Sequence, residues 1–164
     1  MAVQIKSFRN LSDQELLSHC RFEAFRGPGP GGQKRNKTSS AVRITHGPSG
    51  LSAIAGESRS QQRNRQMALE RLRHKIALSV REKLDLARLP DPKVIAISCR
   101  SENYHAAMGK TLDVLTHSGW KISEAAKLLG VSTGRLVDFL RTDAQLWMEV
   151  NRKRQEAGFR GLHT

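Results

Sequence analysis

The chain has 164 residues and a formal net charge of +13, which is enough length for one compact domain, or for a small domain and an appended module. The positive charge is concentrated in residues 21–100, which hold 17 Lys and Arg against 6 Asp and Glu, and this local field favours a phosphate-rich partner such as nucleic acid. Cys20 and Cys99 are far apart and form no CxxC pair, so we expect buried thiols, no metal and no cofactor. The sequence contains no apolar run of membrane-spanning length, so we expect a cytoplasmic protein with no membrane partner.

The first elements predict a small sheet. Ser12 and Glu15 fit a capping box, so a short helix should begin near Ser12. Residues 19–26 then alternate, with Cys20, Phe22 and Ala24 on one side, which predicts a half-buried strand. The stretch 41–46 is rich in β-formers, 47–50 has turn chemistry, and 51–55 should return as a partner strand. We therefore expect one small, mostly antiparallel sheet.

A long amphipathic helix should follow the sheet and pack on it. Residues 59–89 contain no Gly or Pro, and Pro90 and Pro92 should end the helix. Its apolar stripe comprises Met67, Leu72, Ile76, Val80 and Leu84. Its other face displays Arg59, Arg63, Arg65, Arg71, Arg73, Lys75, Arg81 and Lys83. Such a face is either simply solvated or tracks a nucleic-acid backbone.

The rest of the chain has a helical pattern. Residues 93–99 predict either a short strand or an apolar connector, and helices should follow from Tyr104 and over about 144–157. Between them, small Ala125 and Ala126, a turn at Gly130 and apolar Leu136 outline a helix-turn-helix. The predicted fold class is α+β: a domain at 1–92, with its sheet packed on a long helix, a linker at 93–102, and an all-α, helix-turn-helix-like module at 103–164.

The segment from Gly27 to Gln33 has four glycines and two prolines in its first six positions, so it cannot lie within a helix or a central strand. It predicts an irregular loop with a bare backbone, and Gln33 is the one side chain there that both donates and accepts hydrogen bonds. Lys34 to Lys37 follow as a cationic shoulder. This combination indicates an exposed tip that approaches a polyanion.

An ordered string of motifs extends from Arg26 to Asn64. It comprises Gly31-Gly32-Gln33, Asn36-Lys37-Thr38, residues 40–46, Pro48-Ser49-Gly50, Arg59-Ser60-Gln61 and Asn64. The string resembles the catalytic (GGQ) domain of class-I peptide chain release factors, which also occurs alone in codon-independent ribosome-rescue hydrolases. The resemblance covers roughly residues 11–85.

This resemblance implies hydrolysis of the ester between a nascent peptide and P-site tRNA, in the peptidyl transferase centre of the large ribosomal subunit. The implied catalytic residues are Gly31, Gly32 and Gln33. The Gln33 N–H would stabilise the oxyanion, and its side chain would position one water. The implied contacts to rRNA and tRNA phosphates are Lys34, Arg35, Lys37, Arg43, Arg59 and Arg63.

Three functions remain open on the sequence. The chain has no room for stop-codon-reading domains, which favours a codon-independent hydrolase that rescues stalled ribosomes. A catalytically inactive ribosome- or RNA-binding protein of the same fold is a second hypothesis, because Lys34 and Arg35 stand where the family usually has other residues. A DNA-binding helix-turn-helix regulator is a third. The helical module replaces the basic tail of small rescue hydrolases, and we predict that it contacts rRNA, tRNA or a protein partner.

Overall fold

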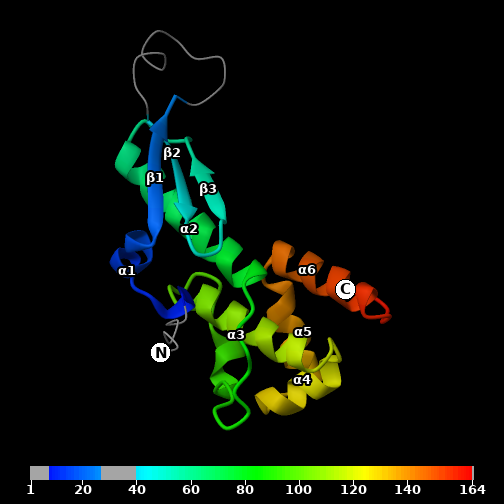
Figure 1. The fold of residues 1–164 in the computed structure, drawn as a ribbon. Coiled ribbons are helices and arrows are strands. Elements are labelled where there is room, and N and C mark those ends of the chain that lie inside the picture. The colour runs from blue at the N-terminus through cyan, green and yellow to red at the C-terminus, as the bar shows by residue number, and fades with distance from the viewer. Residues whose placement is uncertain (1–7, 27–39, 164) are drawn as a thin grey trace. The chain divides into compact units, whose positions relative to one another are not determined.

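A computed structural model describes residues 8–26 and 40–163 of the chain. The chain divides into two compact units, Met1–Ile76 and Ala77–Thr164. The first unit contains the sheet and most of the longest helix, and the second contains the shorter helices that follow (Figure 1). The mixture of an antiparallel sheet with helices confirms the predicted α+β class.

The sheet has three antiparallel strands in the order β1-β2-β3, namely β1 (Cys20–Phe25), β2 (Ala41–His46) and β3 (Ser52–Ala55). The predicted strand and hairpin are therefore confirmed. Central strand β2 buries alternate residues, with Val42, Ile44 and His46 fully inaccessible. Edge strand β1 buries much less, and Phe22, opposite Ile44, is 39% exposed although it belongs to the predicted inner side.

Two short helical elements precede β1. The 3-10 helix η1 spans Phe8–Asn10, and α1 spans Asp13–Ser18. The predicted capping box at the start of α1 is confirmed: the Ser12 backbone N–H donates to Glu15 Oε2 at 2.9 Å, and the Glu15 N–H donates to Ser12 Oγ at 3.3 Å.

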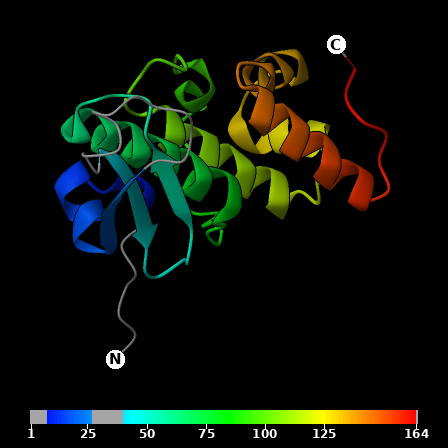
Figure 2. The ribbon, with the colours of Figure 1, turned by 90° about the horizontal axis from the view of Figure 1, so that it is seen from above.

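The long helix α2 spans Gln61–Ser79 and lies along one face of the sheet (Figures 1 and 2). Its residues Asn64, Ala68, Leu72 and Ile76 repeat every four positions and are at most 2% exposed. Leu72 and Ile76 of the predicted stripe are thus confirmed, whereas Met67 is only partly buried. None of the described helices is both long enough and apolar enough to cross a membrane.

The helix is shorter than expected, because it ends at Ser79 and not near Leu89. The Arg81 guanidinium donates to the carbonyls of Ala77 and Leu78, which would otherwise be unpaired at the helix end. The next N–H, of Glu82, donates to the buried carboxylate of Asp113 at 2.9 Å instead of continuing the helix. The sequence predicted a longer helix because residues 59–89 contain no Gly or Pro, and this pattern carries no information about tertiary contacts such as that with Asp113.

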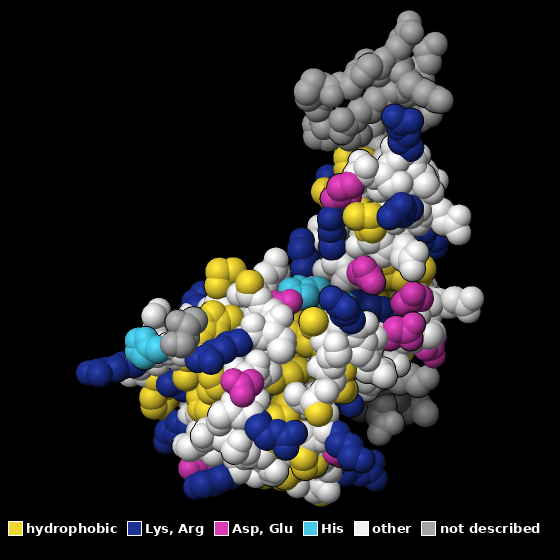
Figure 3. Space-filling view, turned by 180° about the vertical axis from the view of Figure 1, so that it is seen from behind, with side chains coloured by type: hydrophobic (Ala, Val, Ile, Leu, Met, Phe, Trp, Pro, Cys, Tyr) yellow, Lys and Arg dark blue, Asp and Glu magenta, His cyan; other side chains and the backbone are white. Residues whose placement is uncertain are grey.

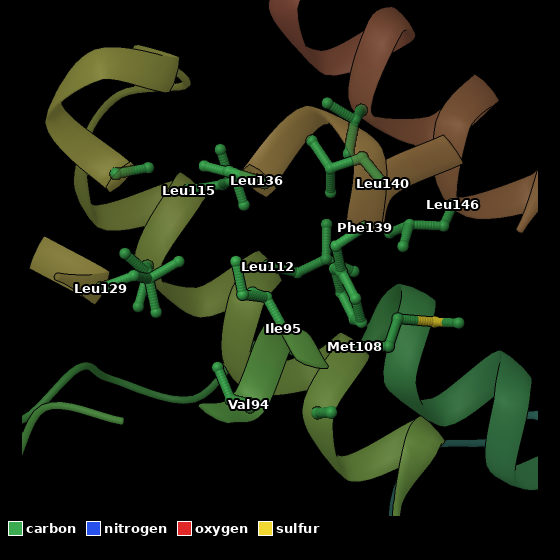
Figure 4. Close-up of a cluster of buried hydrophobic side chains, with 14 of the residues drawn as sticks. Val94, Ile95, Met108, Leu112, Leu115, Leu129, Leu136, Phe139, Leu140 and Leu146 are labelled. Carbon is green, nitrogen blue, oxygen red and sulfur yellow. The ribbon is translucent and has the colours of Figure 1, made fainter. Parts of the chain in front are cut away.

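The second unit is helical, with η2 (Pro92–Ala96), α3 (Tyr104–His117), α4 (Ile122–Leu129), α5 (Thr133–Arg141) and α6 (Ala144–Glu156). Its apolar core gathers Met108, Leu112 and Leu115 of α3 with residues of the later helices (Figure 4). The connection between α4 and α5 is three residues long, and its Gly130 has a φ of +65°.

The sequence left two alternatives for residues 93–99, a short strand or an apolar connector. A strand over 93–99 is absent from the described chain, because the Asp91 carboxylate accepts from the Lys93 N–H at 2.7 Å and begins η2. This turn directs Val94 and Ile95 into the core of the second unit. Cys99 is exposed rather than buried, and Cys20 is half-buried. The domain assignment 1–92, 93–102 and 103–164 stays a prediction.

Candidate functional site

The predicted catalytic residues Gly31, Gly32 and Gln33, and the predicted RNA-binding residues Lys34, Arg35 and Lys37, lie in 27–39, outside the described residues. The residues flanking this segment are described. Antiparallel pairing of β1 with β2 ends at the pair Phe25 and Ala41, so the chain on either side of 27–39 lies at the same end of the sheet. Thirteen residues therefore connect two points that the sheet fixes close together.

Ser40, the residue that follows 27–39, is bonded to the beginning of α2 by the side chain of Asn64. This side chain is fully buried, and its Nδ2 donates to the carbonyl of Ser40 at 2.6 Å and to the carbonyl of Ser58 at 2.8 Å. Its Oδ1 accepts from the Ser58 N–H at 2.9 Å. Both Nδ2 hydrogens and the carbonyl oxygen are thus in use, as burial of an amide requires.

A second close contact joins the same parts of the chain. Gly56, just after β3, approaches Ala41, the first residue of β2, so closely that a Cβ on Gly56 would lie 3.1 Å from the Ala41 Cβ. Ala41 is itself 3% exposed. The β3–α2 connection can lie this close to β2 because residue 56 has no side chain.

The three described members of the predicted RNA-binding set occupy two places. Arg43 lies in β2 on the opposite face from Val42 and Ile44, where it pairs with Glu23 at 3.5 Å and lies over the Phe25 ring at 5.4 Å. Arg59 and Arg63 are exposed around the start of α2. No ion pair joins either guanidinium to another residue of 8–26 or 40–163.

Other arginines and lysines of α2, expected on its basic face, hold the first unit together. Arg71 donates to the Ile54 carbonyl and to Glu57 Oε1, both at 2.6 Å, and Lys75 donates to the Ser52 carbonyl at 2.7 Å. Arg65 lies over the Phe22 ring at 5.2 Å. Arg65, Arg71 and Lys75 are exposed as Arg59 and Arg63 are, so what distinguishes the two groups is contact with partners in the first unit.

The contact with Arg71 also changes the chemistry of Glu57. Hydrogen bonds from Arg71 and from the backbone N–H of Gly56 lower the pKa of Glu57 to about 2. Glu57 is therefore a carboxylate throughout the neutral range, and it neutralises part of the positive charge. On the face shown in Figure 3, Lys and Arg side chains are spread over the surface, with Asp and Glu side chains among them.

The family model described as "RF-1 domain" matches residues 13–106, more than half of the chain. The chain belongs to the RF-1 domain family. Peptide chain release factor 1 of Frankia casuarinae is 34% identical over 124 residues, which cover 73% of this chain and 34% of that relative. Peptide chain release factor 1 of Jannaschia sp. is 41% identical over 97 residues, which cover 57% of this chain and 27% of that relative.

The chain thus spans about a third or less of the length of these curated relatives. The matched RF-1 domain region begins at Asp13 and extends into α3, so it includes every predicted catalytic and RNA-binding residue. Helices α4, α5 and α6 follow the matched region.

Sequence reasoning placed Asn64 in the motif string but gave it no role, and it did not single out Gly56. A signal for Asn64 was present, because it lies four residues before Ala68 and eight before Leu72, on the buried stripe of α2. A polar residue in such a stripe indicates a buried hydrogen-bonding group. The partner of Gly56 could not be read from local sequence, since Ala41 lies 15 positions earlier.

Proposed function

We propose that this protein hydrolyses the ester of peptidyl-tRNA on the ribosome and does so without reading a codon. Membership of the RF-1 domain family, together with an intact Gly31-Gly32-Gln33 between two paired strands, supports the hydrolysis; codon independence is a separate part of the proposal with its own test. The pairing of Phe25 with Ala41 gives the intervening residues a common base at one end of the sheet. A loop that must reach into a narrow ribosomal site needs such a base.

In the proposed reaction, a water oxygen bonds to the ester carbonyl carbon and the bond from this carbon to the tRNA oxygen breaks. The proton lost by the water passes to the departing tRNA oxygen. Negative charge develops on the carbonyl oxygen, and the Gln33 backbone N–H is the proposed donor to it. The neutral Gln33 side chain orients the water and excludes larger nucleophiles, while RNA groups supply proton transfer.

The proposed partners are large-subunit rRNA and P-site peptidyl-tRNA. Arg59 and Arg63 are exposed cations beside the base of the segment, since the next residue, Asn64, bonds the Ser40 carbonyl. Guanidinium groups bind phosphate oxygens in a bidentate manner, which suits them to hold RNA in register. The second unit is proposed to contact rRNA, tRNA or a protein.

The test is release of labelled peptide from purified ribosomes that carry peptidyl-tRNA. The parent should release peptide. Gln33→Ala keeps the backbone N–H but loses the side chain that orients the water, and Gly32→Ala adds a Cβ next to that N–H. Each should reduce the rate by at least about 10²-fold, the scale for lost reactant positioning or a displaced oxyanion donor. Ribosome binding by both variants should remain within about threefold of the parent. Equal release by parent and Gln33→Ala would contradict the proposed chemistry.

Codon independence needs a separate comparison. Ribosomes programmed with truncated, sense-codon and stop-codon mRNA should be tested in parallel, with the same peptidyl-tRNA in the P site. We expect release without a requirement for a stop codon. A strict requirement for a stop codon would overturn this part of the proposal, and binding without release in every complex would favour the inactive RNA-binding alternative.

A further inference from the structure

The bonds of Asn64 connect two functions that the proposed site must coordinate. Ser40 directly follows the segment with the predicted catalytic residues, and Ser58 directly precedes Arg59. A single buried amide donates to the carbonyls of both serines, at 2.6 and 2.8 Å. Its oxygen also accepts the Ser58 N–H at 2.9 Å, which fixes the β3–α2 connection in direction as well as in position.

The amide is held rigidly. Asn64 is in the first turn of α2, and its backbone N–H donates to the Ser60 carbonyl at 3.0 Å. One helical turn later, Ala68 is fully buried, which fixes this side of the helix against the core. Three hydrogen bonds and complete burial restrain the side chain, so a displacement of Ser58 would also displace Ser40.

The approach of Gly56 to Ala41 is an independent second link between the same segments. Gly56 packs closely against the Ala41 side chain, and the Asn64 amide bonds both Ser58 and Ser40. Together, the two links restrain the β3–α2 connection relative to the start of β2. The strand that leads out of the catalytic segment therefore cannot move independently of the connection that carries Arg59.

We propose that Asn64 is a positioning residue for peptidyl-tRNA hydrolysis, which couples the base of the catalytic segment to the RNA-binding residues Arg59 and Arg63. This inference rests on the proposed function. Asn64 touches no reacting atom, and it acts through the Ser40 carbonyl. We call the three hydrogen bonds of Asn64 the clamp. When Arg59 and Arg63 engage phosphates, the clamp fixes Ser40, the residue that directly follows the segment containing Gln33. Displacement of a reacting group by about 1 Å costs on the order of 10²-fold in rate.

The first test compares Asn64→Ala with Leu72→Ala, a substitution of a fully buried α2 residue away from the clamp. Both variants should unfold at lower temperature than the parent. Assayed well below those temperatures, Asn64→Ala should lower kcat for peptide release by about 10- to 100-fold, with KM within about twofold of the parent. Leu72→Ala should retain kcat within about twofold. Equal kcat losses in the two variants, or an unchanged kcat in Asn64→Ala, would overturn the proposal.

A size exchange tests the second link without touching Asn64, and it applies even if Asn64→Ala fails to fold. Gly56→Ala places a Cβ 3.1 Å from that of Ala41 and should lower kcat, because the two segments must separate. The double variant Gly56→Ala with Ala41→Gly removes the crowding and should recover most of the lost kcat. An unchanged kcat in Gly56→Ala, or no recovery in the double variant, would count against coupling through this contact.

Hydrogen exchange supplies a readout other than activity. The Ser58 amide should exchange faster in Asn64→Ala than in the parent, while amides of the α2 interior remain protected. If the parent itself released no peptide in any complex, the proposed function would be wrong. If the parent released peptide and Asn64→Ala released it equally fast, the function would stand and the coupling would be wrong.

Discussion

Arg73 of α2 donates from Nε and Nη2 to Asp13 Oδ1 of α1, at 3.0 and 2.7 Å, and Nη2 also donates to the Leu11 carbonyl at 2.8 Å. The side chain of Arg73 is 15% exposed, whereas that of Asp13 is 64% exposed. This arginine belongs to the set that the sequence offered as a basic face, yet its hydrogen bonds lie within the first unit. Its partners therefore distinguish Arg73 from Arg63, which has no ion pair to another residue of 8–26 or 40–163.

Arg73→Ala should destabilise the first unit more than Asp13→Ala does. Loss of Arg73 leaves the Leu11 carbonyl without its charged donor, at a cost of about 1–3 kcal/mol, while loss of exposed Asp13 costs less than about 1 kcal/mol. The difference should be measured by urea unfolding followed by far-ultraviolet circular dichroism. Tryptophan fluorescence is unsuitable here, because Trp120 and Trp147 both lie in the second unit. Equal losses would show that the ion pair, and not the carbonyl contact, carries the stability.

Arg63→Ala and Arg71→Ala should affect different properties. Arg63 is exposed without an ion pair to the described residues, so its removal should weaken ribosome binding about 3- to 10-fold. It should also reduce the slope of log affinity against log salt by about 1. Arg71 contacts Ile54 and Glu57, so Arg71→Ala should mainly lower stability. Binding titrations at several salt concentrations provide the test, and an unchanged slope in Arg63→Ala would contradict the assignment.

Stability of the first unit should fall as pH decreases from 7 to 5, because of His46. Burial, and then the nearby His19, lower the pKa of His46 below 6.5. Its ring packs edge-to-face with Phe8, with centroids 4.5 Å apart, and its Nδ1 lies 2.7 Å from Ser49 Oγ. Below about pH 6.5 the unfolded state binds more protons than the folded state, so protonation favours unfolding.

The measurement is urea unfolding by circular dichroism at pH 7, 6 and 5, for the parent and for His46→Gln. The variant should have lower stability at pH 7 and a shallower decline toward pH 5, since the group that binds the extra proton is absent. A decline as steep as that of the parent would assign the pH dependence to other groups.

Gly130→Ala should destabilise the second unit, whereas Gly134→Ala should not. Gly130 has a φ of +65°, and an added Cβ would lie 3.3 Å from Pro92 Cγ, so we expect a loss of about 1–2 kcal/mol. Gly134 lies in α5 with open space around it, and alanine there should be neutral or stabilising by up to about 1 kcal/mol. Tryptophan fluorescence follows this unit directly, and similar effects at the two positions would contradict the argument.

Local sequence was sufficient for much of the fold. The capping box at Ser12 and Glu15, the hairpin around Gly47–Gly50 and the turn at Gly130 depend on residues within a few positions of one another, so their patterns predicted them correctly. The family resemblance likewise rests on an ordered string of residues between Arg26 and Asn64, and the match over residues 13–106 confirmed the family.

Tertiary contacts decided where the long helix ends and which polar side chains bond to distant parts of the chain. The helix ends at Ser79 because Arg81 donates to carbonyls at its end and the Glu82 N–H bonds Asp113, which is 31 positions away. The clamp of Asn64 on Ser40 spans 24 positions, and the bond from Arg73 to Leu11 spans 62. Sequence periodicity reports which side of an element is apolar, but it carries no information about which distant backbone group a buried donor will meet. The sequence alone therefore determined the family and its candidate chemistry, whereas the three-dimensional contacts decided what fixes Ser40, the residue after 27–39, to the beginning of α2.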